Sequence, residues 1–99
     1  MTLSPDTMLD IHLSTICSKH RYDEDPRAAI DELLAAAGHR TDILGEVAGT
    51  WSGYHGEEEH CRPLARALRG LPGAERWVAV GEYRRGIPNS GATPLPPSP

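Results

Sequence analysis

The chain of 99 residues contains no Phe, no Gln and a single Lys, and its apolar stretches are short. The longest uninterrupted runs are 33–37 and 77–80, far below the roughly 20 residues of a membrane-spanning helix. The N-terminus has neither the basic segment nor the apolar segment of a secretory signal. We therefore expect a cytoplasmic protein that does not associate with membranes.

Cysteine is also scarce, with only Cys17 and Cys61. A secreted domain of this size usually carries several paired cysteines, so the composition favours a reducing compartment and two free thiols. The expectation of free thiols depends on the compartment and not on geometry. A Cys17–Cys61 disulfide is therefore kept as the alternative.

The remaining composition is that of one small folded domain. Hydrophobic residues make up 38% and charged residues 24% of the chain, too apolar for a wholly disordered protein. Without Phe, the core must come from Leu, Ile, Val and Ala, helped by two Trp and three Tyr. A mass of 10.8 kDa leaves no room for a second domain.

Apolar residues recur three and four positions apart along most of the chain, which is typical of amphipathic helices. The predicted helices are 5–19, 26–37, 42–54 and 62–69. Residues 74–85 fit either a helix or a strand, and we favour a helix because a lone strand has no partner. The predicted fold is all-α: a small irregular bundle of four to five short helices at 1–86, with a disordered Pro-rich tail at 87–99.

Local signals support these boundaries. Ser4 precedes Pro5 and Asp6, the order expected of a capping hydroxyl, a first-turn proline and a first-turn acid. Asp25 can cap the second helix, Thr41 or Asp42 the third, and Gly38 can adopt the positive φ that ends a helix.

Three glycines repeat every four residues in the third predicted helix, at Gly45, Gly49 and Gly53. Each destabilises a helix interior by about 0.5–1 kcal/mol relative to Ala, so the column needs a tertiary reason. The column would let a neighbouring helix or a second copy of the chain approach closely. The alternative is a frayed, irregular segment.

Charge is divided unevenly along the chain. Residues 1–61 carry four Lys and Arg against twelve Asp and Glu, a net −8, whereas residues 62–99 carry six Arg against two Glu, a net +4. The favoured interpretation is that the basic segment packs near the acidic half through weak surface pairs such as Glu58–Arg62. The sharper hypothesis is an anion-binding face built from Arg62, Arg66 and Arg69.

The sequence disfavours nucleic acid as a ligand of this chain. Residues 30–47 resemble a helix–turn–helix in spacing, but the second helix would present Asp42, Glu46 and glycines to the DNA. The isoelectric point of about 5.6 also differs from that of a basic nucleic-acid-binding domain.

A zinc site is the alternative function. Cys17-x-x-His20 has ligand spacing, and His60-Cys61 could complete a set of two Cys and two His. His60 and Cys61 next to Glu57–Glu59 also offer a thiol, a base and a carboxylate, but chain neighbours rarely reach one another on a regular element. No nucleotide-binding or hydrolase motif is present, so we expect no enzyme activity and no cofactor other than this alternative zinc.

The leading hypothesis is a small non-enzymatic protein-interaction or regulatory module that binds another protein or itself. The candidate partner-binding residues are Trp51, Tyr54, Arg62, Arg66 and Arg69. Trp51 and Tyr54 would anchor an interface if both were exposed.

Overall fold

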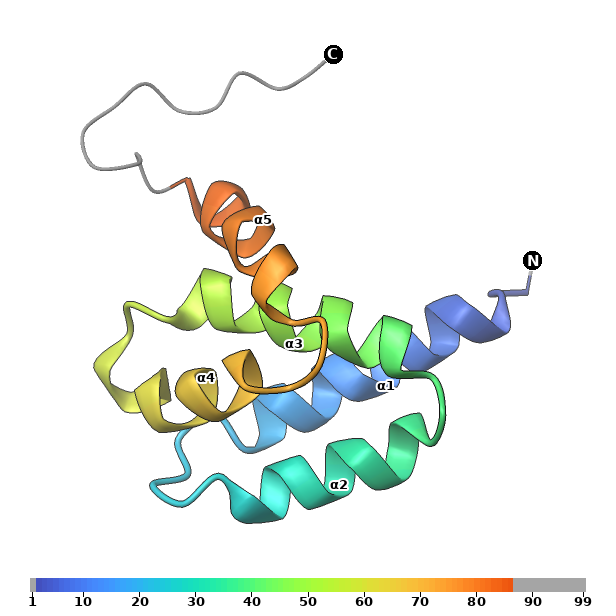
Figure 1. The fold of residues 1–99 in the computed structure, drawn as a ribbon, viewed down its shortest axis with the longest axis horizontal. Coiled ribbons are helices and arrows are strands. Elements are labelled where there is room, and N and C mark those ends of the chain that lie inside the picture. The colour runs from blue at the N-terminus through green and yellow to red at the C-terminus, as the bar shows by residue number, and fades with distance from the viewer. Residues whose placement is uncertain (1, 87–99) are drawn as a thin grey trace.

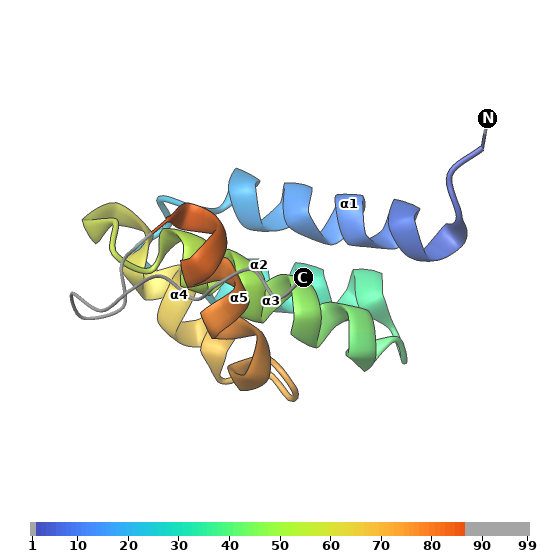
Figure 2. The ribbon, with the colours of Figure 1, turned by 90° about the horizontal axis from the view of Figure 1, so that it is seen from above.

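The helix Thr41–His55 (α3) packs against every other α-helix of the fold. A computed structural model of the chain describes residues 2–86. The other elements are α1 (Pro5–Lys19), α2 (Arg27–Ala37), the short 3₁₀ helix η1 (Glu59–Cys61), α4 (Arg62–Arg69) and α5 (Glu75–Arg85). Figure 1 shows α5 crossing over α3, and Figure 2 shows α1 lying along one side of the bundle.

This arrangement confirms the all-α prediction, because the described residues form helices and no strands. Residues 75–85 form a helix, as favoured over a strand. The predicted tail at 87–99 lies outside the described residues.

The helix ends follow the local signals with small shifts. Ser4 caps α1, since its hydroxyl oxygen accepts a hydrogen bond from the Thr7 amide at 3.1 Å. Gly38 ends α2 with a φ of +58°. Asp25 caps the second helix as expected, since its Oδ1 accepts a hydrogen bond from the Arg27 amide at 3.1 Å, although Pro26 is the residue directly before α2. The expected cap of the third helix is wrong: α3 already begins at Thr41, so Arg40 precedes it and provides no side-chain cap.

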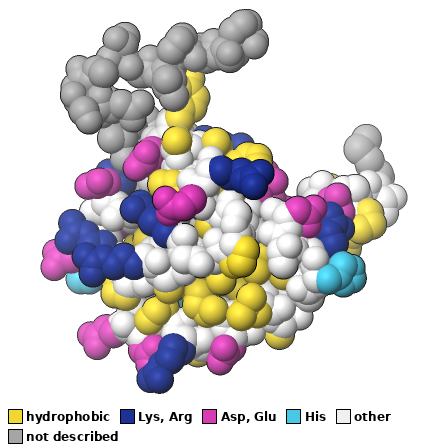
Figure 3. All heavy atoms as spheres, viewed as in Figure 1, with side chains coloured by type: hydrophobic (Ala, Val, Ile, Leu, Met, Phe, Trp, Pro, Cys, Tyr) yellow, Lys and Arg dark blue, Asp and Glu magenta, His cyan; other side chains and the backbone are white. Residues whose placement is uncertain are grey.

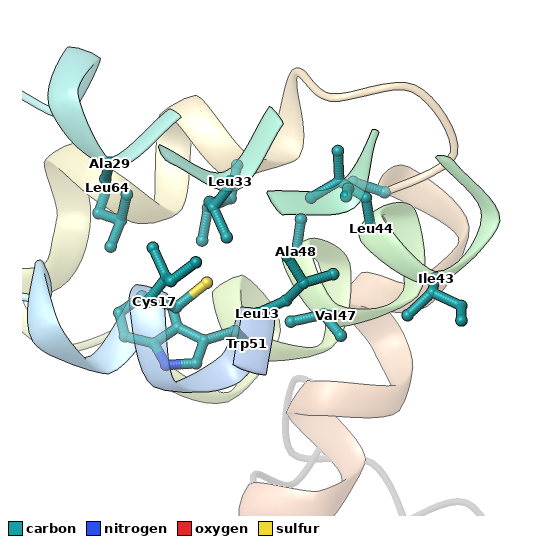
Figure 4. Packing of buried hydrophobic residues seen from close by; sticks show 14 of the residues in the cluster. Leu13, Cys17, Ala29, Leu33, Ile43, Leu44, Val47, Ala48, Trp51 and Leu64 are labelled. Carbon is teal, nitrogen blue, oxygen red and sulfur yellow. The ribbon is translucent and has the colours of Figure 1, made fainter. Parts of the chain in front are cut away.

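The core lies where α1, α2, α3 and α4 meet. Figure 4 shows side chains from these four helices pointing into a common interior. The largest hydrophobic side chains that are fully buried are Leu13, Leu33, Leu44, Leu64 and Leu68. The leucines thus take the place that Phe would fill in many cores of this size.

The glycine column of α3 lies against α5. A β-carbon added at Gly49 would overlap the Ala74 carbonyl, and one at Gly53 would overlap the Val78 carbonyl. Gly81 of α5 is the reciprocal residue, since its added β-carbon would overlap the Thr50 carbonyl. The two helix backbones therefore touch directly, and only glycine permits this at these positions.

This contact decides between the interpretations of the column. The neighbour that the glycines admit is a helix of the same chain, and the frayed-segment alternative is wrong, because α3 is continuous from Thr41 to His55. The helix-propensity loss is offset by close packing of α5.

The expected pairing between the basic segment and the acidic half is wrong for the described residues. Within residues 2–86, ion pairs join no arginine of α4 or α5 to an acid, and Glu58 pairs with His55 instead of Arg62. Two arginines donate to carbonyls at the end of α3: Arg69 to Ser52 O at 3.4 Å and Arg85 to Tyr54 O at 3.3 Å. A helix C-terminus attracts cations because its last carbonyls lack partners.

We expect Gly49→Ala to lower the free energy of unfolding by about 2–3 kcal/mol, because the added methyl must push α5 away from α3. Urea denaturation measures this. The matched control is Gly70→Ala, whose β-carbon would lie 3.4 Å from the Ala67 carbonyl, an ordinary contact. The control should change stability by less than about 0.5 kcal/mol, and equal losses in the two variants would contradict the α3–α5 contact.

Candidate functional site

An open groove runs between α1 and α3 and reaches the last turn of α5. One hollow of about 290 Å³ is lined by residues that include Asp10 and Ser14 of α1, Glu46 and Tyr54 of α3 and Arg84 of α5. A second hollow of about 340 Å³ shares Asp10 and Glu46 with the first and continues toward the start of both helices. We call these two hollows together the α1–α3 groove.

The groove is predominantly acidic. Asp6 and Asp42 also line it, and Arg40 pairs with both, at 2.9 Å and 3.1 Å. This guanidinium lowers the pKa of the Asp42 carboxyl. Asp10 and Glu46 have no ion-pair partner in the part of the chain that the structure describes. Within residues 2–86, the groove therefore holds two carboxylates that have no ion-pair partner, one from each helix, and Arg84 of α5 lines the same hollow.

Aromatic side chains form one end of the groove. The Tyr54 side chain is exposed (41%), whereas Trp51 belongs to the core and is only 7% exposed. His55 lies against both rings, with centroid distances of 4.3 Å to Trp51 and 4.9 Å to Tyr54. Trp51 and Tyr54 thus share the groove, but they are not exposed together as an interface anchor would require.

Two polar atoms of residues that line the groove lack partners. Trp51 Nε1 and Thr50 Oγ1 are buried and make no hydrogen bond within residues 2–86. Buried polar groups without a partner are uncommon in native proteins, and they often mark places where water or a ligand completes the structure.

The predicted arginine face lies away from the groove. Arg62 and Arg66 are exposed on α4, while Arg69 is half-buried and donates to the end of α3. Figure 3 shows charges of both signs around a hydrophobic area on the side of the molecule that carries α2 and α4. The structure therefore separates the candidate partner-binding residues into an aromatic pair in the groove and two exposed arginines elsewhere.

The four ligands of the alternative zinc site have separate environments. Cys17 is buried in the core. His20 uses both ring nitrogens, with Nδ1 at 2.6 Å from Asp23 and Nε2 at 2.8 Å from Glu32. His60 is exposed and its ring meets Tyr22 edge-on. Among the described residues, these four side chains do not gather into one metal-sized group.

Cys61 instead belongs to a group that we call the turn cluster, formed by His55, Glu58 and Cys61. His55 Nδ1 lies 2.5 Å from Glu58 Oε2, and the Cys61 thiol donates to Glu58 Oε1 at 3.9 Å. One nitrogen, one oxygen and one sulfur atom of this group lie within 4.8 Å of one another. Because His55 also lines the groove, the turn cluster lies at its aromatic end.

Both cysteines are free, as predicted, and both are buried. Burial raises the pKa of the Cys17 thiol to about 12. Burial, followed by the charge of Glu58, also raises the pKa of the Cys61 thiol. Both thiols are therefore protonated at neutral pH, and the thiol–base pair considered for His60 and Cys61 is not formed, since Cys61 contacts Glu58.

Sequence reasoning missed Asp10, Glu46 and His55. The spacing His55-x-x-Glu58-x-x-Cys61 was a usable signal, because two turns of three residues bring such side chains to one side. Asp10 and Glu46 had no signal, since their proximity depends on how α1 packs on α3.

No family model, curated protein or solved structure matches the chain. None of the described helices is both long enough and apolar enough to cross a membrane.

The contacts of His20 generate a pH prediction. The hydrogen bonds that His20 donates, first to Glu32 and then to Asp23, raise the pKa of His20 above its ordinary value. The bonds stabilise the folded protein fully below the unfolded-state pKa, about 6.5, and this contribution is lost as pH rises through the higher folded-state pKa.

We expect Glu32→Gln to lower the His20 pKa and to flatten the fall of stability across that pH window. NMR titration of the imidazole and urea unfolding at a series of pH values measure the two effects. Glu24→Gln is the control, because Glu24 is exposed and makes no hydrogen bond or ion pair within residues 2–86. An unchanged His20 pKa in Glu32→Gln would show that the hydrogen bond between His20 and Glu32 does not raise this pKa.

Proposed function

We propose that this protein is a protein-interaction module whose α1–α3 groove binds a basic segment of a partner protein. The observation that carries this proposal is that Asp10 and Glu46, which form no ion pair within residues 2–86, line the same groove from two helices. Two free thiols in a small domain suit a reducing compartment, so a cytoplasmic location is part of the proposal.

Charge gives the groove its preference for a cation. Asp6 and Asp42 share the compensating charge of Arg40, but Asp10 and Glu46 have no such partner in residues 2–86. A Lys or Arg side chain bound in the groove would be attracted by both carboxylates, because Asp10 and Glu46 line the same two hollows. Such pairs contribute specificity and association rate more than affinity.

The aromatic end suits the other parts of a basic segment. The exposed Tyr54 ring offers a flat face on which the aliphatic stem or the charged head of Lys or Arg can lie. The unpaired Trp51 Nε1 is a hydrogen-bond donor, which a backbone carbonyl of the bound segment could satisfy after a small movement of the groove wall. The groove thus combines charge, an aromatic surface and an unsatisfied donor, which together resemble a peptide-binding site.

A direct test uses a synthetic peptide of alternating lysine and alanine, titrated into isotope-labelled protein and followed by amide NMR shifts. We expect the largest shifts along the groove, at Asp10, Ser14, Glu46 and Thr50. The double variant Asp10→Asn/Glu46→Gln should bind about fivefold more weakly, since each lost charge pair contributes about 0.5 kcal/mol.

The matched control is Glu24→Gln/Asp31→Asn, which removes two exposed acids outside the groove and changes the net charge equally. It should bind the lysine peptide almost as the natural protein does, and a peptide with glutamate in place of lysine should not bind. If both double variants weakened peptide binding equally, net charge and not the groove would account for the binding. NMR shifts confined to α4 would place the binding surface outside the groove. Either result would contradict the proposal.

A further inference from the structure

The chain after α3 makes two consecutive tight turns. The Glu58 amide donates to the His55 carbonyl and the Cys61 amide donates to the Glu58 carbonyl, both at 3.0 Å. Each bond spans three residues, so the side chains at positions 55, 58 and 61 return to the same side of the chain. The backbone therefore holds the turn cluster together before any side chain interacts.

From this geometry we propose that His55, Glu58 and Cys61 form a binding site for Zn²⁺. The donors are an imidazole nitrogen, a carboxylate oxygen and a sulfur atom, the three ligand types that protein zinc sites use. Three protein ligands leave the fourth tetrahedral position for a water molecule. This site differs from the one that spacing suggested, with which it shares only Cys61.

The dimensions of the turn cluster fit a zinc ion after small side-chain movements. Bonds of about 2.0–2.3 Å to zinc place tetrahedral ligand atoms roughly 3.3–3.6 Å apart. The ligand atoms of the turn cluster lie within 4.8 Å of one another, and the closest pair, His55 Nδ1 and Glu58 Oε2, is 2.5 Å apart. The Glu58 side chain is half exposed, so it can rotate without disturbing the core.

Charge balance also favours a divalent ion. The turn cluster holds two proton-mediated contacts, one between His55 and Glu58 and one from the Cys61 thiol to Glu58. Zinc would replace the protons in these contacts, since a coordinated thiol ionises and releases its proton to solvent. A thiolate, a carboxylate and a neutral imidazole then neutralise the charge of the ion.

A neighbouring cation, Arg21, affects how tightly the turn cluster would bind a metal ion. Arg21 lies close enough for its charge to act on both Cys61 and Glu58. It stacks over the Tyr22 ring and donates to the Ser18 carbonyl, so it is held near the turn cluster. This cation disfavours a bound metal ion, and removing it should tighten metal binding.

The experiment titrates the full chain with Co²⁺ under reducing conditions and records its visible and near-ultraviolet absorption. We expect one equivalent to bind, with the intense visible bands of tetrahedral cobalt and a thiolate-to-cobalt band, and Zn²⁺ should displace it. Glu58→Gln should weaken Co²⁺ binding at least tenfold. Cys61→Ser should abolish the thiolate band, and Arg21→Gln should strengthen binding.

Two control variants separate this site from the set suggested by spacing. His60→Asn and His20→Asn should leave Co²⁺ affinity unchanged within twofold, because neither side chain belongs to the turn cluster. His55→Gln tests the site without touching a buried residue, should Cys61→Ser fail to fold. Absence of stoichiometric Co²⁺ binding, or binding lost in His20→Asn and kept in Glu58→Gln, would overturn the proposal.

Discussion

The direct backbone contact between α3 and α5 is the constraint on which the remaining structure depends. Gly81 is the buried residue of α5, and the helix contributes few large side chains to the core. It is held instead by close approach to Gly49 and Gly53, where many dispersion contacts become available at short range. In this chain without Phe, α5 therefore packs on α3 through glycines that allow close backbone contact, and not through large apolar side chains.

The same contact places the groove. One side of α3 is taken by α5, and another packs its apolar residues against α1, α2 and α4. Glu46 and Thr50 each follow a glycine of the column, so they lie at the edge between α5 and α1. Their polar side chains therefore border the α1–α3 groove. A binding surface of this kind results from the central position of α3.

The C-terminal end of α3 combines two kinds of electrostatic interaction. Its carbonyls accept hydrogen bonds from Arg69 and Arg85, which accounts for part of the basic charge in the second half of the chain. The chain then turns twice and brings Glu58 back toward His55. The basic groups thus stabilise the helix end, and the acidic and sulfur groups beside it remain available for a ligand.

Local sequence patterns by themselves determined the helices. Apolar spacing, the Ser4 cap and the Gly38 stop depend only on residues within a turn or two, so the helix positions could be predicted to within one residue. The glycine column predicted a close helix contact, but it did not identify the helix that makes it. Only the tertiary structure decided that α5 packs on the glycine column, that Asp10 and Glu46 line one groove, and that Arg69 donates to a carbonyl of α3, because each depends on residues distant in the chain. Cys17 and Cys61 were predicted to be free, but their different surroundings, one apolar and one beside a carboxylate, are set by packing that no spacing of residues encodes.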